Sequence, residues 1–282
     1  MEFTTLIGVD DLRAIIGSPD VVILDARFSL DDEQWGKHAY AEGHIPGAIQ
    51  ADTADHLAGE IITGVTGRRP FPEPAVFAER LSAWGIGDGT QVIAYDADGG
   101  LMSAARVWLM LRWMGHDRVA VLDGGWQAWL AAGGDVSTDV PKPTPAEFTT
   151  RLRPELLVEV DEVDEARQRP LTCVFDSRGE EGYHGRGVYH DPVRGHIAGA
   201  GLADRAHTLT EDKHFRSPAE LRTHYDALIG EQRPSDIIFY CGSGITAAQN
   251  VLAMTVAGLP GSRMYVGSWS EWITDPRRPT EL

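Results

Sequence analysis

Residues 43–48 read Gly-His-Ile-Pro-Gly-Ala, and residues 195–200 read Gly-His-Ile-Ala-Gly-Ala. Two six-residue segments that differ at one position stand out in a chain of 282 residues. A segment that recurs far along a chain indicates that a whole structural unit has been duplicated. The sequence on either side of these two segments therefore decides the architecture.

Three further pairs of segments recur in the same order around the two hexapeptides. In the first half they are residues 21–27 (VVILDAR), 92–96 (VIAYD) and 121–126 (VLDGGW), and in the second half residues 173–178 (CVFDSR), 237–241 (IIFYC) and 265–269 (YVGSW). Corresponding positions lie between 143 and 152 residues apart. Four ordered matches at nearly constant separation predict two copies of one domain.

Each half alternates short β-branched or aromatic runs with stretches of helical periodicity, such as residues 104–114 and 246–255. This alternation is typical of a parallel sheet with helices on both faces. We predict an α/β protein with domains at residues 1–138 and 155–282. The connector, residues 139–154, contains three prolines at alternate positions, which exclude a helix or a central strand and predict an extended linker.

The composition limits the classes of partner. The chain has 25 basic and 42 acidic residues, a formal charge of −17, which argues against nucleic-acid and anionic-membrane partners. No apolar run approaches the roughly 18–20 residues that span a bilayer, and the N-terminal residues lack the pattern of a signal peptide. We therefore expect a cytoplasmic protein. Its two cysteines, Cys173 and Cys241, form no disulfide framework and no metal-binding spacing.

The two halves differ most where the chemistry is expected. Cys241 follows the predicted strand of the second half and precedes Gly-Ser-Gly, whereas Asp96 stands at the equivalent point of the first half. A tight turn from strand to helix directs several backbone N–H groups inward, and they and the helix dipole favour a thiolate over a thiol. An aspartate cannot act as a sulfur nucleophile. We expect Cys241 to be catalytic and Cys173, inside an apolar strand, to be inert.

The repeated segments, the loop at residues 241–246 (CGSGIT) and the closing residues 267–272 (GSWSEW) resemble the tandem-domain rhodanese family over nearly the whole chain. The resemblance implies two rhodanese-like domains, the first one silent, and a cysteine in the second that cycles between thiol and persulfide. The CGSGxT form of the loop is similar to that of 3-mercaptopyruvate sulfurtransferases. The implied reaction moves sulfane sulfur from 3-mercaptopyruvate to a thiol, such as thioredoxin or a small thiol, or to cyanide.

The site residues follow from this reading. Cys241 is the expected nucleophile, and Ser243 and Thr246 are expected to donate hydrogen bonds to the persulfide or the leaving group. The remaining positions of the loop, which supply backbone N–H groups around the sulfur, are Gly242, Gly244, Ile245 and Ala247. Positive charge for the substrate is expected from Arg186, Arg69 and Arg178.

The sequence departs from the mercaptopyruvate pattern at two places. Gly182 stands where an arginine is expected to hold the substrate carboxylate, and Arg186 lies just beyond it. A serine–histidine–aspartate relay proposed for these enzymes would match Ser243, but its histidine falls on or near Arg69, beside Arg68. Its aspartate has no clean match, with Asp52 and Asp55 nearby.

Residues present in both halves are better explained by structure than by catalysis. Asp25 with Arg27 and Asp176 with Arg178 occupy matching positions, which predicts a structural ion pair in each domain. His44 and His196 also match, so a shared role in fixing the following loop is expected of both histidines.

Three other functions remain in view. A thiosulfate sulfurtransferase would use the same persulfide cycle with another donor. A sulfur-carrier or redox-sensing module would load Cys241 without efficient turnover. A cysteine-dependent phosphatase would need an arginine six residues after its cysteine, where this chain has Ala247. No nucleotide-binding fingerprint or metal-ligand set is apparent, so no cofactor is expected beyond the covalent sulfur.

Overall fold

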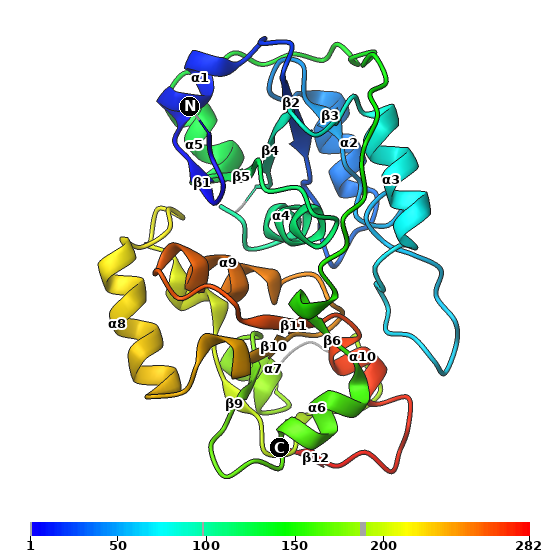
Figure 1. Cartoon of the computed structure of the whole chain (residues 1–282), viewed down its shortest axis with the longest axis vertical. Helices are drawn as coiled ribbons and strands as arrows, with labels where there is room; N and C mark the ends of the chain where they lie inside the picture. The colour runs from blue at the N-terminus through cyan, green and yellow to red at the C-terminus, as the bar shows by residue number, and fades with distance from the viewer. Residues whose placement is uncertain (1, 98, 187–189) are drawn as a thin grey trace. The chain divides into compact units, whose positions relative to one another are not determined.

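The computed structural model describes residues 2–97, 99–186 and 190–282 (Figure 1). The chain divides into two compact units. The first unit contains Met1–Ala58, Phe71–Arg153 and Thr210–Phe215, and the second contains Gly59–Pro70, Pro154–Leu209 and Arg216–Leu282. The short segment Gly59–Pro70 therefore belongs with the second unit although it lies early in the chain. The contiguous boundaries at residues 138 and 155 stay a prediction.

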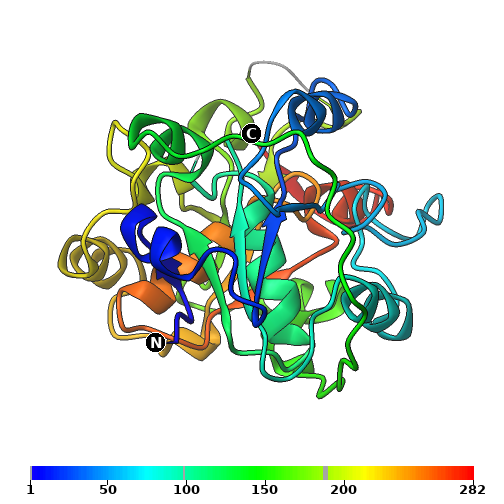
Figure 2. The same ribbon diagram turned by 90° about the horizontal axis from the view of Figure 1, so that it is seen from above.

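The first unit is built on a five-stranded parallel sheet in the order β1-β5-β4-β2-β3. Its strands are β1 (Leu6–Ile7), β2 (Val21–Asp25), β3 (Ile49–Gln50), β4 (Gln91–Tyr95) and β5 (Val119–Leu122). Its helices are α1 (Val9–Ile15), α2 (Trp35–Glu42), α3 (Pro74–Ala83), α4 (Ser103–Trp113) and α5 (Gly125–Ala131). Figure 2 shows the strands of this unit side by side, from blue β2 to green β5.

Alternation along the strands divides the core of the first unit between two faces. Ile93 and Tyr95 of β4 and Leu122 of β5 pack with Leu12 of α1 and Trp129 of α5 in one buried cluster. The intervening strand residues face the opposite way, where α4 lies against β4 and β5. Nearly every residue of α4 is buried.

The second unit repeats this sheet with the order β6-β11-β10-β7-β9, again parallel. Its strands are β6 (Leu157–Val158), β7 (Val174–Asp176), β9 (Gly201–Leu202), β10 (Ile238–Tyr240) and β11 (Arg263–Tyr265). The α-helices are α6 (Val160–Ala166), α7 (Glu180–Tyr183), α8 (Pro218–Ile229), α9 (Ala248–Val256) and α10 (Ser268–Trp272). A two-stranded antiparallel ribbon joins β8 (His196–Ile197) to β12 (Thr280–Glu281).

The strand order places the candidate site. In the second unit the chain leaves β7 toward one edge of the sheet and leaves β10 toward the other, so the two strands flank a switch point. Ligands of open parallel sheets bind at the carboxyl ends of strands beside such a point. Arg178 follows β7 and Cys241 follows β10. The predicted fold class, two tandem parallel-sheet α/β domains, is confirmed.

No helix among the residues that the structure describes is long and apolar enough to cross a membrane.

Candidate active site around Cys241

Cys241 lies directly after β10, at the start of the turn that leads into α9. Its side chain is buried, with 1% exposure, and its thiol is free. Gly244 is required in this turn, because it adopts a φ of +80° and because a Cβ there would collide with the carbonyl oxygen of Val266. The turn can therefore close tightly around the sulfur.

The hydrogen bonds around the sulfur favour the thiolate. Burial alone would raise the pKa of Cys241, since it penalises the charged form. The hydroxyl of Thr246 and the backbone N–H groups of Ser243 and Ala247 donate to the sulfur, with a further contribution from Ser268. Together these donors outweigh burial and lower the pKa of Cys241 below its usual value. For Cys173 burial prevails and raises the pKa, as expected for an inert thiol.

Ser268 contacts Cys241, and the sequence did not predict it as a site residue. The N–H of Cys241 donates to Ser268 Oγ at 3.1 Å, and the same oxygen lies 3.8 Å from Cys241 Sγ. Ser268 also donates to the carbonyl oxygen of Tyr265 at 2.9 Å. Its φ of 57° is in the left-handed region, which a serine rarely adopts. Such a backbone conformation at a buried position often marks a functional site.

The first unit has a glycine at the equivalent place. Gly125 has the same φ of 57°. It is followed by Trp126, whose N–H donates to Asp96, as the N–H of Trp269 donates to Cys241. Aligning GGW at residues 124–126 with GSW at residues 267–269 could have identified Ser268, because a serine replaces a glycine only in the half that carries the thiol.

Arg178 is tied to Asp176 as the sequence predicted. Its Nε and Nη2 donate to the carboxylate at 2.6–3.0 Å, and Nη2 also donates to the carbonyl oxygen of Gly195. Burial opposes the charge, but Asp176 raises the pKa of Arg178 above its usual value. Arg27 makes the same bonds to Asp25 in the first unit. The predicted ion pair is confirmed in both units.

Arg68 brings positive charge to the catalytic turn. A Cβ on Gly242 would lie 3.7 Å from Arg68 Nη2 and 3.8 Å from Arg178 Cδ. Two arginine side chains therefore border Gly242. Burial lowers the pKa of Arg68, whereas the charge of the Cys241 thiolate raises it. Arg68 is further held by an ion pair with Asp191 and by a hydrogen bond from its N–H to Ser270 Oγ at 3.0 Å.

The other two predicted substrate-binding residues have different neighbours. Arg69 Nη1 donates to the carbonyl oxygen of Arg68 at 2.8 Å. Arg186 is 54% exposed and pairs with Glu181 at 3.2 Å. Gly182, at the position of the expected arginine, lies against Arg178, because a Cβ there would be 3.1 Å from Arg178 Cβ.

Ser243 and the two aspartates considered for a relay belong to different units. Ser243 and Thr246 are both buried in the catalytic turn. Asp52 belongs to the first unit and accepts from the N–H groups of Ala54 and Asp55. Asp55 pairs with Lys37 at 2.7 Å. Both aspartates therefore have local structural partners.

The matched histidines have the structural role that the sequence predicted. His44 stacks on Tyr40, with ring centroids 4.0 Å apart, and its Nδ1 bonds to the carbonyl oxygen of Tyr40. His196 stacks on Tyr183 at 3.7 Å and bonds to its carbonyl oxygen in the same way.

A pocket of about 370 Å³ adjoins the catalytic turn within the second unit. Arg68, Asp191 and Ser270 line it together with Ile61, Gly64, Thr66, Gly67, His190, Pro192, Ile273 and Thr274. Arg68 therefore borders both this pocket and Gly242. It is large enough for a small carboxylic acid.

The first unit has no thiol at the equivalent turn. Asp96 is fully buried, and its carboxylate accepts from the N–H groups of Gly100, Met102 and Ala104. The amide ring that surrounds the sulfur in the second unit is here occupied by an internal carboxylate.

A buried thiol with a lowered pKa in a ring of N–H groups, at the switch point of one of two duplicated α/β units, is typical of transferases that carry a group on cysteine. The rhodanese-like domain model matches residues 8–132 and 159–275. The chain therefore belongs to the rhodanese family of sulfurtransferases.

Its relatives include sulfurtransferases named for each of the two sulfur donors considered above. A probable 3-mercaptopyruvate sulfurtransferase of Pseudomonas aeruginosa is 40% identical over 280 residues, which cover 99% of this chain and 98% of the relative. The thiosulfate sulfurtransferase of Cricetulus griseus is 34% identical over 94% of this chain and 89% of its own. The 3-mercaptopyruvate sulfurtransferase SseA of Escherichia coli has a similar structure, with a TM-score of 0.81 and 30% identity over 95% of this chain and all of that one.

Proposed function

We propose that the protein transfers sulfane sulfur from 3-mercaptopyruvate to a thiol or cyanide through a persulfide on Cys241. The observation that carries this proposal is the set of donors that lowers the pKa of a buried thiol beside two arginines. The close sequence relationship to a probable 3-mercaptopyruvate sulfurtransferase supports the choice of donor.

In the first half-reaction the Cys241 thiolate attacks the sulfur of 3-mercaptopyruvate. The new S–S bond forms as the C–S bond breaks, and its electron pair leaves on carbon as the enolate of pyruvate. The enolate takes the proton of the donor thiol and becomes pyruvate, so Cys241 is left as the persulfide anion. The N–H groups of Ser243 and Ala247 and the hydroxyl of Thr246 stabilise the negative charge on sulfur.

Arg68 and Arg178 are proposed to hold the substrate carboxylate. Arg178 keeps two of its nitrogens on Asp176, so it contributes mainly charge and orientation. Arg68 borders both the pocket and Gly242, where it can meet a carboxylate that displaces Asp191. Arg68 thereby replaces the arginine missing at Gly182, a role that the sequence assigned to Arg69 or Arg186.

In the second half-reaction an acceptor thiolate or cyanide attacks the outer sulfur. The S–S bond breaks and Cys241 leaves as a thiolate, which the lowered pKa makes a good leaving group. A small thiol and a thioredoxin-type protein are both proposed acceptors. The two free cysteines suit a reducing compartment, so we retain the cytoplasm as the proposed location.

Thiosulfate is the second candidate donor, and Arg68 is the observation in its favour. The turn itself has no cation, but Arg68 supplies one next to Gly242. A compact dianion could use it while sulfite leaves with the electron pair of the broken S–S bond.

Steady-state kinetics with the two donors, each with cyanide and with a dithiol as acceptor, test the proposal. We expect a higher kcat/KM for 3-mercaptopyruvate. A higher kcat/KM for thiosulfate would assign the protein to the second donor. Stoichiometric loading of Cys241 without turnover would instead indicate a sulfur-carrier module.

A further inference from the structure

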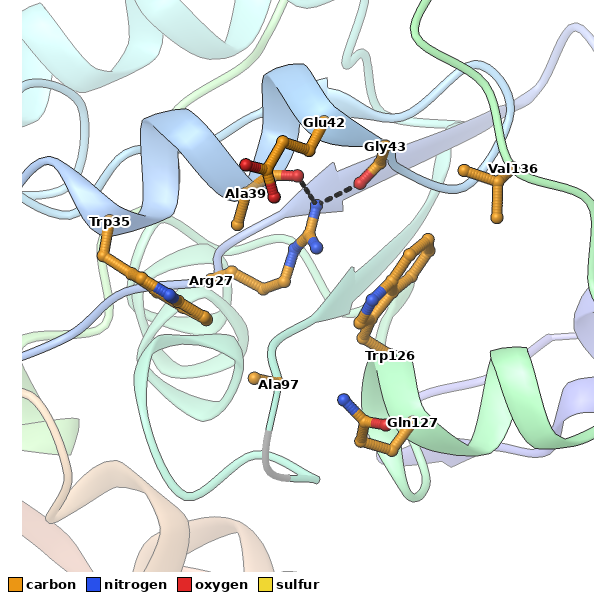
Figure 3. A pocket seen from close by; sticks show the side chains of 9 residues that line it. All are labelled: Arg27, Trp35, Ala39, Glu42, Gly43, Ala97, Trp126, Gln127 and Val136. Atoms are coloured by element: carbon orange, nitrogen blue, oxygen red, sulfur yellow. Dashed lines mark hydrogen bonds between the residues drawn. The ribbon is translucent and has the colours of Figure 1, made fainter.

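The first unit contains a pocket of about 300 Å³ that the proposed reaction does not use. Figure 3 shows its lining: Arg27, Trp35, Ala39, Glu42, Gly43, Ala97, Trp126, Gln127 and Val136. Its volume lies at the lower end of the range for small-molecule sites. Its lining combines two indoles with a cation, a carboxylate and an amide.

This pocket is the first-unit counterpart of the region around Arg178. Arg27 and Arg178 each bind the aspartate two residues earlier and a glycine carbonyl, that of Gly43 or Gly195. The guanidinium of Arg27 lies 4.6 Å from the ring centroid of Trp126, as that of Arg178 lies 5.3 Å from that of Trp269. The unit without a thiol has therefore kept the contacts of this arginine.

Arg27 offers one nitrogen to this pocket. The side chain is 95% buried, and its Nε and Nη2 bond to Asp25, with Nη2 also bonded to the carbonyl oxygens of Ala39 and Gly43. Figure 3 shows Nη1 turned away from those two carbonyls, toward the side of Trp126. A buried guanidinium nitrogen in this position can donate to a carboxylate or carbonyl oxygen of a ligand.

A simple anion fits this pocket poorly. Asp96 precedes the lining residue Ala97, and its carboxylate already occupies the ring of N–H groups. Asp25 balances the charge of Arg27, and Glu42 adds a negative charge at the pocket. An anionic ligand would therefore meet more negative than positive charge.

The remaining lining favours a cationic group. Trp35 is 38% exposed and lines the same pocket as Glu42. Indole faces and a carboxylate are the groups that bind ammonium ions, including methylated ones.

We infer that this pocket binds a small zwitterion, an amino acid or its N-methylated betaine. The carboxylate accepts from Arg27 Nη1, and the ammonium group lies between Glu42 and Trp35. The binding is non-covalent and involves no sulfur transfer, because no thiol lines this pocket in the part of the chain that the structure describes.

Calorimetric titration of the full chain with glycine betaine, tetramethylammonium and acetate tests this inference. Tetramethylammonium represents the ammonium group of betaine, and acetate represents its carboxylate. We expect betaine to bind with a dissociation constant of about 1 mM or lower. Each half should bind at least about tenfold more weakly, because it makes only one of the two charge contacts. The inference would be overturned if acetate bound as tightly as betaine. It would also be overturned if betaine showed no binding at about 50 times the expected dissociation constant.

Two variants locate the binding. Glu42→Gln and Trp35→Ala should each weaken betaine binding by about 3- to 10-fold, since each removes one partly exposed contact to the ammonium group. Glu33→Gln, a change at an exposed residue of the same segment that is not among the residues lining the pocket, is the matched control and should leave binding unchanged. Equal binding by Glu42→Gln and the control would contradict the inference. Sulfur transfer by all three variants should match that of the unmodified chain, so this test is independent of the proposed reaction.

Discussion

The backbone N–H of Cys241 donates to the hydroxyl oxygen of Ser268, 27 positions later, and Ser268 adopts the left-handed φ of 57° to accept it. Gly125 shows the same φ where no thiol needs support. A serine in the left-handed region is less stable than a glycine by about 1 kcal/mol or more. The second unit therefore has a strained residue, Ser268, where its hydroxyl group contacts Cys241.

Ser268→Gly should lower the activity without lowering the stability. The glycine matches Gly125 and relieves the backbone strain, so the melting temperature should stay the same or rise. Loss of the hydroxyl removes one of the groups that lower the pKa of Cys241, so that pKa should rise. The thiolate exists above the pKa, and the acid limb of the kcat/KM profile should therefore move to higher pH.

The rate of thiol alkylation against pH measures this shift directly in Ser268→Gly, with Cys173→Ser present in all samples to remove the second thiol. We expect about a 3- to 10-fold loss of kcat/KM near neutral pH, from the loss of about one hydrogen bond. An unchanged profile would show that Ser268 supports only the backbone.

Cys241→Ser should abolish sulfur transfer, and Cys173→Ser should leave it nearly intact, because only the Cys241 thiol has a lowered pKa. Intact-mass measurement after incubation with donor should show one added sulfur, about 32 Da, as a persulfide requires. Cyanide should remove it. Mass that maps to Cys173 would exclude Cys241 as the carrier.

Arg68→Ala should raise KM for 3-mercaptopyruvate. A charge-assisted contact is worth about 1.5–3 kcal/mol, so kcat/KM should fall about 10- to 150-fold. Arg69→Ala should have a smaller effect, since its Nη1 bonds to a backbone carbonyl. Arg277→Ala, at an 89% exposed side chain, is the control for removal of one positive charge. Equal losses for Arg68→Ala and Arg69→Ala would contradict the assignment of the clamp.

Glu271 should make stability pH-dependent. Burial and the charge of Glu159 raise the pKa of Glu271 to about 7. The folded state therefore binds the proton more tightly than the unfolded state, whose carboxyl titrates near its ordinary value of 4.5. The stabilisation is fully present below that ordinary value and is lost as the pH rises toward and through 7.

Glu271→Gln removes this titration and should melt at a higher temperature than the unmodified chain at pH 8.5, with a smaller difference at pH 5. Each kcal/mol corresponds to about 2–4 °C for a unit of this size. Differential scanning calorimetry at the two pH values is the measurement. A constant difference between the two proteins would show that Glu271 does not titrate in this range.

The sequence was sufficient to predict the fold and to single out Cys241 as the candidate nucleophile, because both inferences depend on local patterns that occur twice. The strand segments of the two halves match in pairs. Asp96 and Cys241 occupy equivalent positions but differ in chemistry, and this difference indicates the reactive position. The same duplication explains why the order of the strands is the same in both sheets. Glycines after Cys241 are visible in the sequence and indicate the tight turn.

The choice between Arg68 and Arg69 could not be made in this way. Adjacent residues of an irregular segment point in different directions, and only the packing decides which one faces the thiol. Here Gly67 lies directly against the carbonyl of Gly267, and Ser270 holds the N–H of Arg68. These contacts join residues about 200 positions apart, with no periodicity that would link them.

The carboxylate of Asp96 also has a thermodynamic consequence. The ring of N–H groups in the first unit contains the carboxylate of Asp96, whereas the ring around Cys241 contains a negative charge only after ionisation or sulfur loading. A charged group that is better stabilised in the folded than in the unfolded chain raises the free energy of unfolding. The sulfur-loaded second unit should therefore resist unfolding more than the empty one, while the first unit is indifferent to the load. The melting temperature of the second unit would then report whether Cys241 carries the additional sulfur atom.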